Sequence, residues 1–553
     1  MFPRVLAALL LALSSCAAAR EAAPAYDTIL RGGTIYDGSG GAPYKGDVAI
    51  KGDRIAAVAR RIPGKGRAEI DARGLAVAPG FINMLSWAAE PLIRDGRAQS
   101  DVRQGVTLEV MGEGWSMGPF SPAQKAEALA EQTAGNRYPI AWTTLGEFLA
   151  FLERKGVSVN IASMVGASTV RVHELGRNDV DPTPEQLERM RALVRQAMDE
   201  GAMGVGSSLI YVPALYAETD ELAALAGEAG RCGGMYISHI RSEGGGLLAA
   251  IDELVEIARR SGARAEIYHL KAAGRSNWPL IDPALAKIEA ARAAGVPVTA
   301  DMYLYTASGT GLDSTLPVWV REGGIPAMLE RLRQPELRAR VIAEMQSGPR
   351  DWSTVQPVGF ARAELRALAG KRMTEIAALR GKGPAETAVD LIVEEGGGVG
   401  TIFHSISEEG LRKVLARPWV SFGSDAAAFA AEPPFTDKAV HPRAYGNFAR
   451  LLGRYVREEK VLTLQEAVRR LTSLPADNLR IADRGRLRTG FHADLAVFDP
   501  ATIADRATYT ASHAYAAGMR HVFVNGVAVL RDGEHTGAKP GRFVKGPGWR
   551  KCR

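Results

Sequence analysis

Apolar strand-like runs alternate with amphipathic helix-like segments through the middle of the chain, and this alternation constrains the fold most. GGMYISHI is followed by LLAAIDELVEIARRSG, AEIYHL, PALAKIEAARAAG and VPVTADMYLY. The repeat of roughly thirty residues is the length of one βα unit. The strand-like runs are rich in Val, Ile and Ala, which is typical of parallel strands buried on both faces. The sequence therefore predicts an α/β protein with a TIM-like (β/α)8 barrel over 76–484.

Segments outside this repeat predict two further parts. Short alternating runs broken by glycine occupy 26–75, and similar runs return at 485–545, so we expect the two ends to pair as one small β-sandwich. Within the barrel region a helical insertion is expected over 316–398. Because nine strand-like runs compete for eight places, one of them, VGTIFHS or its neighbourhood, is expected outside the barrel.

The first residues predict export from the cytoplasm. Residues 1–19 carry Arg4, an apolar run and then small residues, which is the pattern of a signal peptide. Leu13 to Cys16 resembles a lipobox, so we expect a periplasmic protein or a membrane-anchored lipoprotein of a bacterium, lipidated at Cys16. The alternative is simple cleavage after Ala19. No later stretch is apolar enough to span a bilayer.

Composition excludes several classes of protein. The 553 residues are 46% hydrophobic and 24% charged, which is ordinary for a globular chain. The formal charge of +6 comes from Lys and Arg interspersed with Asp and Glu, which indicates solvated helix faces rather than a nucleic-acid groove. Besides Cys16 the chain has only Cys232 and Cys552, so no disulfide framework is expected and Cys232 is interpreted as a buried small hydrophobe.

Polar side chains end several of the apolar runs. His239, His269, Asp301 and Asp425 each stand where a barrel strand meets the mouth of the active site. One such histidine is more often a core or loop residue, but two in consecutive units followed by a late aspartate favour a metal site. Zinc accepts imidazole and carboxylate ligands and keeps one position open in catalytic sites. Asp425 is then expected as the base that takes a proton from water, and the alternative for GSDA is an Asx turn or helix cap.

Several blocks of sequence resemble one family. SSLIYVPALYAETDEL, YISHIRSEG, YHLKAAG, GSDAAAF, HPRAYGNFARLLGRYV and GFHADLAVFDP are similar to the D-aminoacylase (N-acyl-D-amino-acid deacylase) branch of the amidohydrolase superfamily, from about residue 26 to the C-terminus. The resemblance implies zinc bound by His239, by His269 and by a cysteine after the second strand, with Asp425 as general base and acid. It also implies that a substrate carboxylate is held by three residues, Lys271, Tyr303 and Arg443.

The chain departs from that family at two points. The family opens with a His-x-His that forms a weaker second metal position in the D-aminoacylases. In this chain Leu85-Ser86-Trp87 stand there instead, so we expect one zinc per chain. The cysteine is also missing, and Glu113 in MGEGWS lies in its neighbourhood. A carboxylate is an ordinary zinc ligand, so Glu113 is expected as the third one. The alternative for Glu113 is an exposed acid in a glycine turn.

These residues leave three functions to compare. The first is a zinc-dependent amidohydrolase that cleaves the amide bond of small N-acyl amino acids, with the D form implied by the resemblance. The second is a non-catalytic extracytoplasmic binding lipoprotein, favoured by Trp87 if its ring fills the space that a metal needs. The third is a cyclic amidase of the dihydroorotase or hydantoinase type. It ranks last because the resemblance implies a two-metal site for those enzymes, and this chain shows neither the histidine pair nor a convincing bridging lysine for one.

Overall fold

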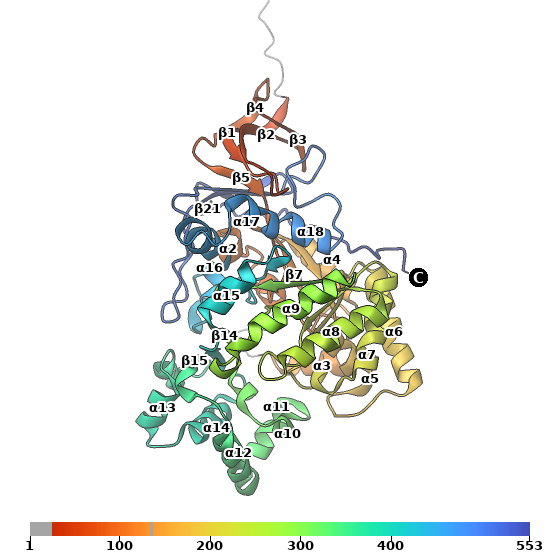
Figure 1. The fold of residues 1–553 in the computed structure, drawn as a ribbon, viewed down its shortest axis with the longest axis vertical. Helices are drawn as coiled ribbons and strands as arrows, with labels where there is room; N and C mark the ends of the chain where they lie inside the picture. The colour runs from red at the N-terminus through yellow and green to blue at the C-terminus, as the bar shows by residue number, and fades with distance from the viewer. Residues whose placement is uncertain (1–24, 133–136, 553) are drawn as a thin grey trace, which may run out of the picture.

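Strands from both ends of the chain form one sheet. The computed structural model describes residues 25–132 and 137–552. The nine-stranded sheet lies at one end of the molecule (Figure 1), and β18 pairs antiparallel with β5, which joins the two chain ends. In order across the sheet its strands are β21 (Glu534–His535), β20 (Val527–Arg531), β19 (Met519–Val524), β18 (Leu495–Phe498), β5 (Ala76–Pro79), β1 (Tyr26–Ile35), β2 (Tyr44–Lys51) and β3 (Arg54–Ala59), with β4 (Gly66–Asp71) beside β1.

Two parallel sheets occupy the centre of the molecule. One contains β6 (Phe81–Asn83), β7 (Val106–Met111) and β8 (Asn160–Ser163). The other contains β9 (Val165–Gly166), β10 (Gly204–Ser208), β11 (Met235–His239), β12 (Arg264–Ile267), β13 (Val298–Met302) and β17 (Val420–Phe422). The backbone N–H of Met84 donates to the carbonyl of Phe422 (3.2 Å), and that of Met203, just before β10, donates to the carbonyl of Ser163 in β8 (2.9 Å), so hydrogen bonds join the sheets at both edges.

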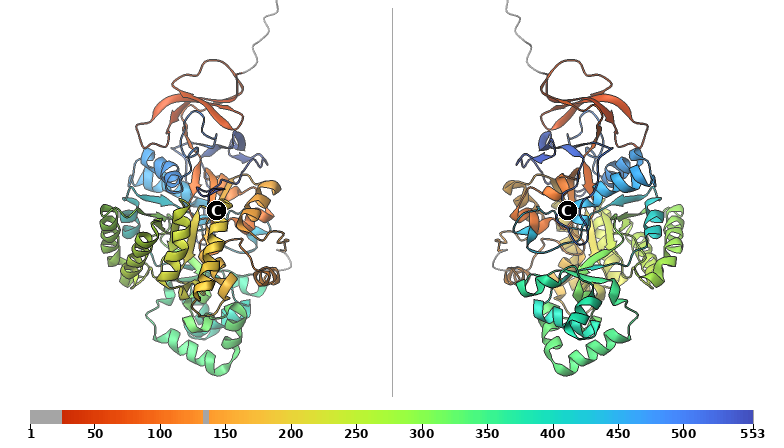
Figure 2. Two further views of the ribbon diagram at one scale, coloured as in Figure 1. Left: turned by 90° about the vertical axis from the view of Figure 1, so that its right-hand side faces the viewer. Right: turned by 90° about the vertical axis from the view of Figure 1, so that its left-hand side faces the viewer.

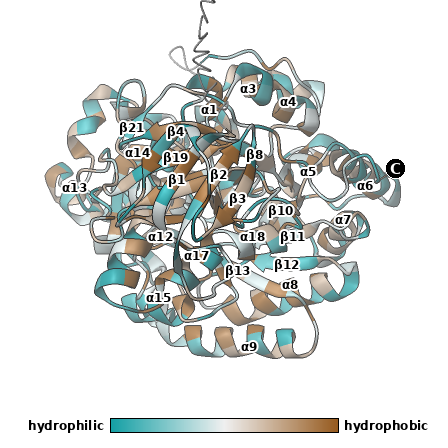
Figure 3. Cartoon of the chain, turned by 90° about the horizontal axis from the view of Figure 1, so that it is seen from above, coloured by the Kyte–Doolittle hydropathy of each residue, from teal (hydrophilic) through white to brown (hydrophobic). Residues whose placement is uncertain are grey.

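Helices cover the outside of these strands. Figure 3, seen from above, shows helices outside β12 and β13, with strands of the nine-stranded sheet over the centre of the view, and Figure 2 shows the chain from two further sides. Each helix packs its apolar stripe on neighbouring strands, which is how an α/β layer excludes water from both faces of a parallel sheet. The helices in contact with these strands include α5 (Ala167–Leu175), α6 (Pro184–Asp199), α7 (Thr219–Arg231), α8 (Leu247–Ser261), α9 (Ile281–Ala293) and α17 (Leu464–Leu471).

A further unit interrupts the parallel strands between β13 and β17. It lies at the end of the molecule opposite the nine-stranded sheet (Figure 1) and has its own apolar core, which includes Leu312, Leu332 and Val341. VGTIFHS forms β16 there and pairs with two antiparallel neighbours, outside the parallel sheets. The unit consists of β14 (Ser308–Gly311), α10 (Val318–Arg321), α11 (Gly324–Arg333), α12 (Pro335–Ser347), β15 (Val355–Gly359), α13 (Met373–Arg380), α14 (Pro384–Glu395) and β16 (Gly400–Phe403).

The interpretation of Cys232 as an unpaired buried residue is wrong. Cys232 forms a disulfide with Cys552, and their Cα atoms are 5.5 Å apart although 320 positions separate them in sequence. The C-terminal segment returns to this point through backbone bonds from Gly546 to Gly201 and from Arg550 to Asp199. Sequence spacing does not predict such a long-range return of the tail.

The predicted leader, with its lipobox at Cys16, lies outside the described residues. Within the residues that the structure does describe, no helix has both the length and the apolar character needed to cross a membrane.

Candidate metal centre and active site

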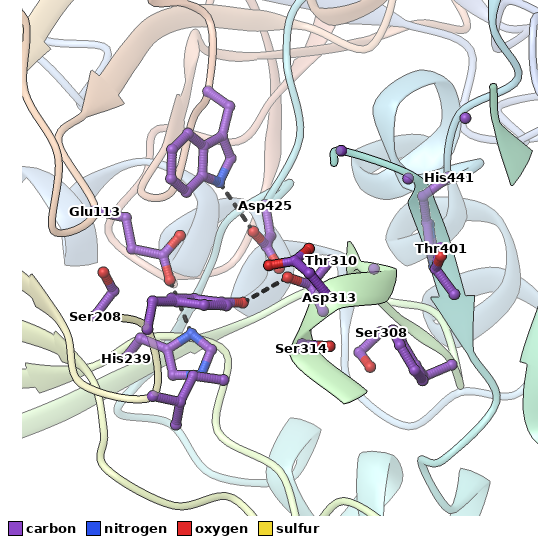
Figure 4. A pocket seen from close by; sticks show the side chains of 18 of the residues that line it. Glu113, Ser208, His239, Ser308, Thr310, Asp313, Ser314, Thr401, Asp425 and His441 are labelled. Atoms are coloured by element: carbon purple, nitrogen blue, oxygen red, sulfur yellow. Dashed lines mark hydrogen bonds and ion pairs between the residues drawn. The ribbon is translucent and has the colours of Figure 1, made fainter. Parts of the chain in front are cut away.

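Three possible ligand atoms meet at the carboxyl ends of the central strands. Oε1 of Glu113, which follows β7, lies 3.0 Å from Nδ1 of His239 and 3.2 Å from Nε2 of His269. The three side chains are buried, and their ligand atoms lie within 4.8 Å of one another. Figure 4 shows Glu113 directed toward His239. This set of two imidazoles and one carboxylate is one that zinc binds in catalytic sites, with a fourth position left free.

Local backbone geometry directs these side chains inward. Gly112 and Gly114 flank Glu113 at φ 103° and 69°, a conformation that L side chains rarely adopt. A Cβ on Gly112 would lie 2.4 Å from the carbonyl oxygen of Met164, so a larger residue cannot occupy this turn without movement. His269 also has a positive φ (39°), and its backbone N–H donates to Oδ1 of Asp301 (2.8 Å). The MGEG and YHLK segments therefore hold Glu113 and His269 in place through positive-φ backbone that close packing and hydrogen bonds stabilise.

The electrostatics of the cluster suit a cation. Burial alone would raise the pKa of Glu113, but hydrogen bonds from His239 and His269 outweigh burial and bring this pKa to about 2. Burial and Lys271 lower the pKa of His269, yet the carboxylates of Glu243 and Glu113 raise it to about 10. A buried carboxylate thus stays ionised because positive charge adjoins it. A metal ion can supply the same positive charge, so the residues present fit a zinc ion.

Glu243 is a site residue that the sequence interpretation did not assign. Its Oε1 lies 2.9 Å from Nδ1 of His269, and it forms an ion pair with Lys271. Burial alone would raise the pKa of Glu243, but Lys271 and both histidines hold this pKa below its usual range. A carboxylate on the second nitrogen of a ligating histidine orients the ring. The sequence feature that could have identified Glu243 is its position four residues after His239, in SHIRSEG.

Asp425 follows β17 and is held by one hydrogen bond and one ion pair. The indole Nε1–H of Trp87 donates to Oδ1 (3.2 Å), and a terminal guanidinium nitrogen of Arg443 lies 2.8 Å from Oδ2. Asp425 and Glu113 line the same cavity (Figure 4). Trp87 is directed at Asp425, while the atoms of Glu113 and the two histidines remain together. Leu85, two residues before Trp87, is buried in the core.

Lys271, Tyr303 and Arg443 also come together. Nζ of Lys271 lies 5.4 Å and the guanidinium carbon of Arg443 lies 4.6 Å from the centre of the Tyr303 ring. The hydroxyl of Tyr303 and Nε of Arg443 are buried without a hydrogen-bond partner among the described residues. Buried polar groups normally have partners, so this surplus of donors beside the cavity is suited to an anionic ligand.

His441 holds Arg443 in place. Its Nδ1 accepts a hydrogen bond from the backbone N–H of Arg443 (3.1 Å), and its Nε2 lies 3.0 Å from the carbonyl oxygen of Ala307. Burial lowers the pKa of His441 well below its usual value, so the ring is neutral and carries its proton on Nε2. The ring thereby ties the start of α16 (Arg443–Arg450) to the segment before β14.

These groups open into one large cavity between the parallel strands and the inserted unit. Its volume is about 2160 Å³. Its wall includes Glu113, Asp425 and Arg443 from the central part, and Asp313 and Thr401 from the inserted unit. All seven predicted site residues lie on this one cavity, although they are spread from position 113 to position 443. The inserted unit therefore forms part of the cavity wall.

The fold and this site define a class of protein. Residues 68–530 match the model of the amidohydrolase family, and the chain belongs to this family. It lies in the D-aminoacylase branch, so it is a hydrolase that acts on carbon–nitrogen bonds other than peptide bonds.

Particular relatives are similar along nearly the whole chain. An N-acyl-D-glutamate deacylase of Alcaligenes xylosoxydans xylosoxydans is 32% identical over 519 residues, covering 94% of this chain and 96% of the relative. The N-acyl-D-glutamate deacylase of Bordetella bronchiseptica, solved with zinc and a phosphonate mimic of the tetrahedral intermediate, is 29% identical with a TM-score of 0.77, covering 94% of this chain and 99% of that one. A D-aminoacylase described for one-metal activation and second-metal attenuation is 31% identical with a TM-score of 0.77, covering 94% and 100%.

Proposed function

We propose that this protein is a zinc-dependent N-acyl-D-amino-acid deacylase that uses one metal ion. Its substrates are small amides with a free carboxylate, and its products are a carboxylic acid and a free amino acid. The observation that carries the proposal is the Glu113, His239 and His269 cluster. It shares its cavity with Asp425, and with the Tyr303 hydroxyl and Nε of Arg443, which have no hydrogen-bond partner among the described residues. The names of the similar deacylases support the same reaction.

Each side chain has a defined task in this reaction. Asp425 takes a proton from a water molecule as the water oxygen bonds to the amide carbonyl carbon. The carbon–nitrogen bond then breaks, and Asp425 gives that proton to the leaving amine. Lys271, Tyr303 and Arg443 hold the substrate carboxylate, which fixes the carbonyl relative to Asp425.

Glu113, His239 and His269 would hold the zinc ion, and Glu243 would orient His269 from behind. When bound, zinc would supply Lewis acidity that polarises the carbonyl and acidifies water. We infer a single ion because Leu85 and Trp87 offer no ligand atom for a second one, and one-metal activation is described for a similar D-aminoacylase.

Metal analysis and a substrate panel test this proposal together. We expect about one zinc per chain in purified mature protein and turnover of N-acyl-D-amino acids over their L forms. The cavity of about 2160 Å³ exceeds what an N-acetyl group needs, so the panel should extend to longer acyl groups. Excess zinc should leave the rate unchanged, since Leu85 and Trp87 offer no ligand atom for a second ion. Metal-free protein that binds acylated amino acids without turnover would overturn the proposal.

Replacing Tyr303 with Phe tests whether its hydroxyl donates a hydrogen bond to the substrate carboxylate. The Tyr303 hydroxyl has no hydrogen-bond partner among the described residues, so its removal should leave the melting temperature unchanged. A hydrogen bond to a charged group contributes about 1.5–3 kcal/mol, so kcat/KM for a carboxylate substrate should fall about 10- to 100-fold. The matched control is the α-carboxamide of the same substrate, for which Tyr303→Phe should change little. Equal losses for both substrates would contradict this role.

We also infer that the parallel strands from β6 to β17 close as an eight-stranded (β/α)8 barrel, because hydrogen bonds join the two parallel sheets at both edges. In this barrel β8 and β9, which only Met164 separates, count as one strand. β5 (Ala76–Pro79) falls within the predicted barrel range 76–484 but pairs with β1 and β18, so the attached β domain consists of the segments 26–79 and 485–545. We infer an extracytoplasmic location from the predicted leader. The Cys232–Cys552 disulfide supports this location because such bonds persist in oxidising compartments.

A further inference from the structure

Trp87 has a combination of features that packing does not explain. Its side chain is 41% exposed although it lies beside a buried strand end, and the exposed ring lines the active-site cavity. Its indole N–H donates to Oδ1 of Asp425 across 338 residues of sequence. A large apolar ring that stays open to a cavity while its one polar atom binds the catalytic carboxylate indicates a role in the site.

The backbone around Trp87 fixes this contact. The backbone N–H of Trp87 donates to the carbonyl of Ala426 (2.9 Å), and the backbone N–H of Asp425 donates to the carbonyl of Leu85 (2.9 Å). Asp425 also has φ 48°, in the left-handed region, which persists only where the surroundings support it. The two segments are therefore joined on both sides of the side-chain bond, which fixes the backbone of Trp87 relative to that of Asp425.

The ion-pair partner of Asp425 has a second task. Arg443 contacts Oδ2 of Asp425, but under the proposed function it also receives the substrate carboxylate. When Arg443 shares its donors with the substrate, the bond from Trp87 remains. The indole bears no charge, so a substrate carboxylate does not draw it away from Asp425 as it would Arg443, and the hydrogen bond from Trp87 remains as a restraint on Asp425.

We propose that Trp87 is a positioning residue for the catalytic base, and this inference rests on the proposed function. The indole N–H holds Oδ1 of Asp425 so that the rest of the carboxylate faces the water and the leaving amine. Trp87 therefore places a neutral hydrogen-bond donor where the D-aminoacylase branch is expected to carry a histidine of its His-x-His.

Two substitutions separate the donor from the ring. Trp87→Phe keeps an aromatic ring and removes the N–H, while Trp87→Gln keeps an N–H donor of similar reach and removes the ring. We expect Trp87→Phe to lower kcat about 10- to 100-fold with KM within threefold, and Trp87→Gln to recover part of that loss. Zinc content should stay at the wild-type value in both. The matched control is Trp549→Phe, an exposed tryptophan outside the cavity, which should leave kcat unchanged.

A double-mutant cycle with Asp425→Asn tests the coupling directly. If Trp87 acts through Asp425, Trp87→Phe should cause little further loss once Asp425 is replaced. Additive losses in the cycle, or a kcat for Trp87→Phe within twofold of wild type, would overturn the inference. An inactive wild-type protein would instead overturn the proposed function.

Indole NMR signals decide the inference even without turnover. In protein carrying ¹⁵N-labelled tryptophan, the indole signal that disappears in Trp87→Phe belongs to Trp87. We expect Asp425→Ala to shift that signal and to leave the Trp549 signal in place. An unchanged Trp87 signal in Asp425→Ala would contradict the hydrogen bond on which the inference depends.

Discussion

Asp425→Asn should reduce turnover to a small residual rate while the protein keeps its fold and its zinc. Asparagine has the size of aspartate but cannot accept a proton from water or return one to the amine. General acid–base catalysis contributes about 10²–10⁴-fold per group, and Asp425 serves both steps, so we expect kcat to fall by about 10³–10⁴-fold. The measurement is steady-state kinetics on a substrate that the wild-type enzyme turns over, with zinc determined on the same samples.

The contacts of Asp425 shape the control for this variant. The Asn carbonyl oxygen can still accept from Trp87, whereas its amide NH2 would face Arg443, so a modest loss of stability is expected. Asp437→Asn makes the same chemical change at an exposed position outside the cavity wall and should leave kcat unchanged. Substrate affinity can be measured directly in Asp425→Asn, because turnover no longer consumes the ligand. A kcat within tenfold of wild type would contradict the role of Asp425 as the base.

The ends of strands were the most predictable part of the site. A polar residue that ends a buried parallel strand lies at the edge of the barrel where all the carboxyl ends of the strands meet. His239 and Asp425 could therefore be placed on one cavity from local sequence alone. Glu113 required a further step, because a carboxylate between two glycines is compatible with an exposed turn. Its burial depends on Gly112 and Gly114 approaching Met164 and Ser208, which no local pattern reveals.

Contacts between distant segments were the least predictable. The sequence suggested that the Trp87 ring fills the space of a metal ion. In the structure its single polar atom, the indole nitrogen, binds Asp425. Glu243 stood in a quoted motif, yet its task depends on the distance between two loops that follow different strands. The Cys232–Cys552 pair likewise depends on the path of the C-terminal segment. Periodicity specifies which face of an element is buried, but it does not specify which side chains of two loops meet.

Removing the charge of Glu113 should remove the zinc. Glu113→Gln preserves size but replaces the anionic ligand with a neutral amide, which is a poor match for a zinc ion. Changes to residues behind zinc ligands already weaken metal affinity about 10- to 100-fold, so loss of a direct ligand should weaken it by more than about 100-fold. The primary measurement is zinc per chain after dialysis against a chelator series, which does not depend on activity.

The neighbours of Glu113 make its charge difficult to replace. Oε1 of Glu113 contacts both imidazoles, and its pKa of about 2 means that the carboxylate is ionised throughout the working pH range. Glu113→Asp keeps the charge with a side chain one methylene shorter, so we expect it to retain more zinc than Glu113→Gln. Glu90→Gln is the matched control, since Glu90 is an exposed glutamate at the same cavity and should retain full zinc. Wild-type zinc affinity in Glu113→Gln would exclude Glu113 as a ligand and would leave the two histidines to bind the metal with another group.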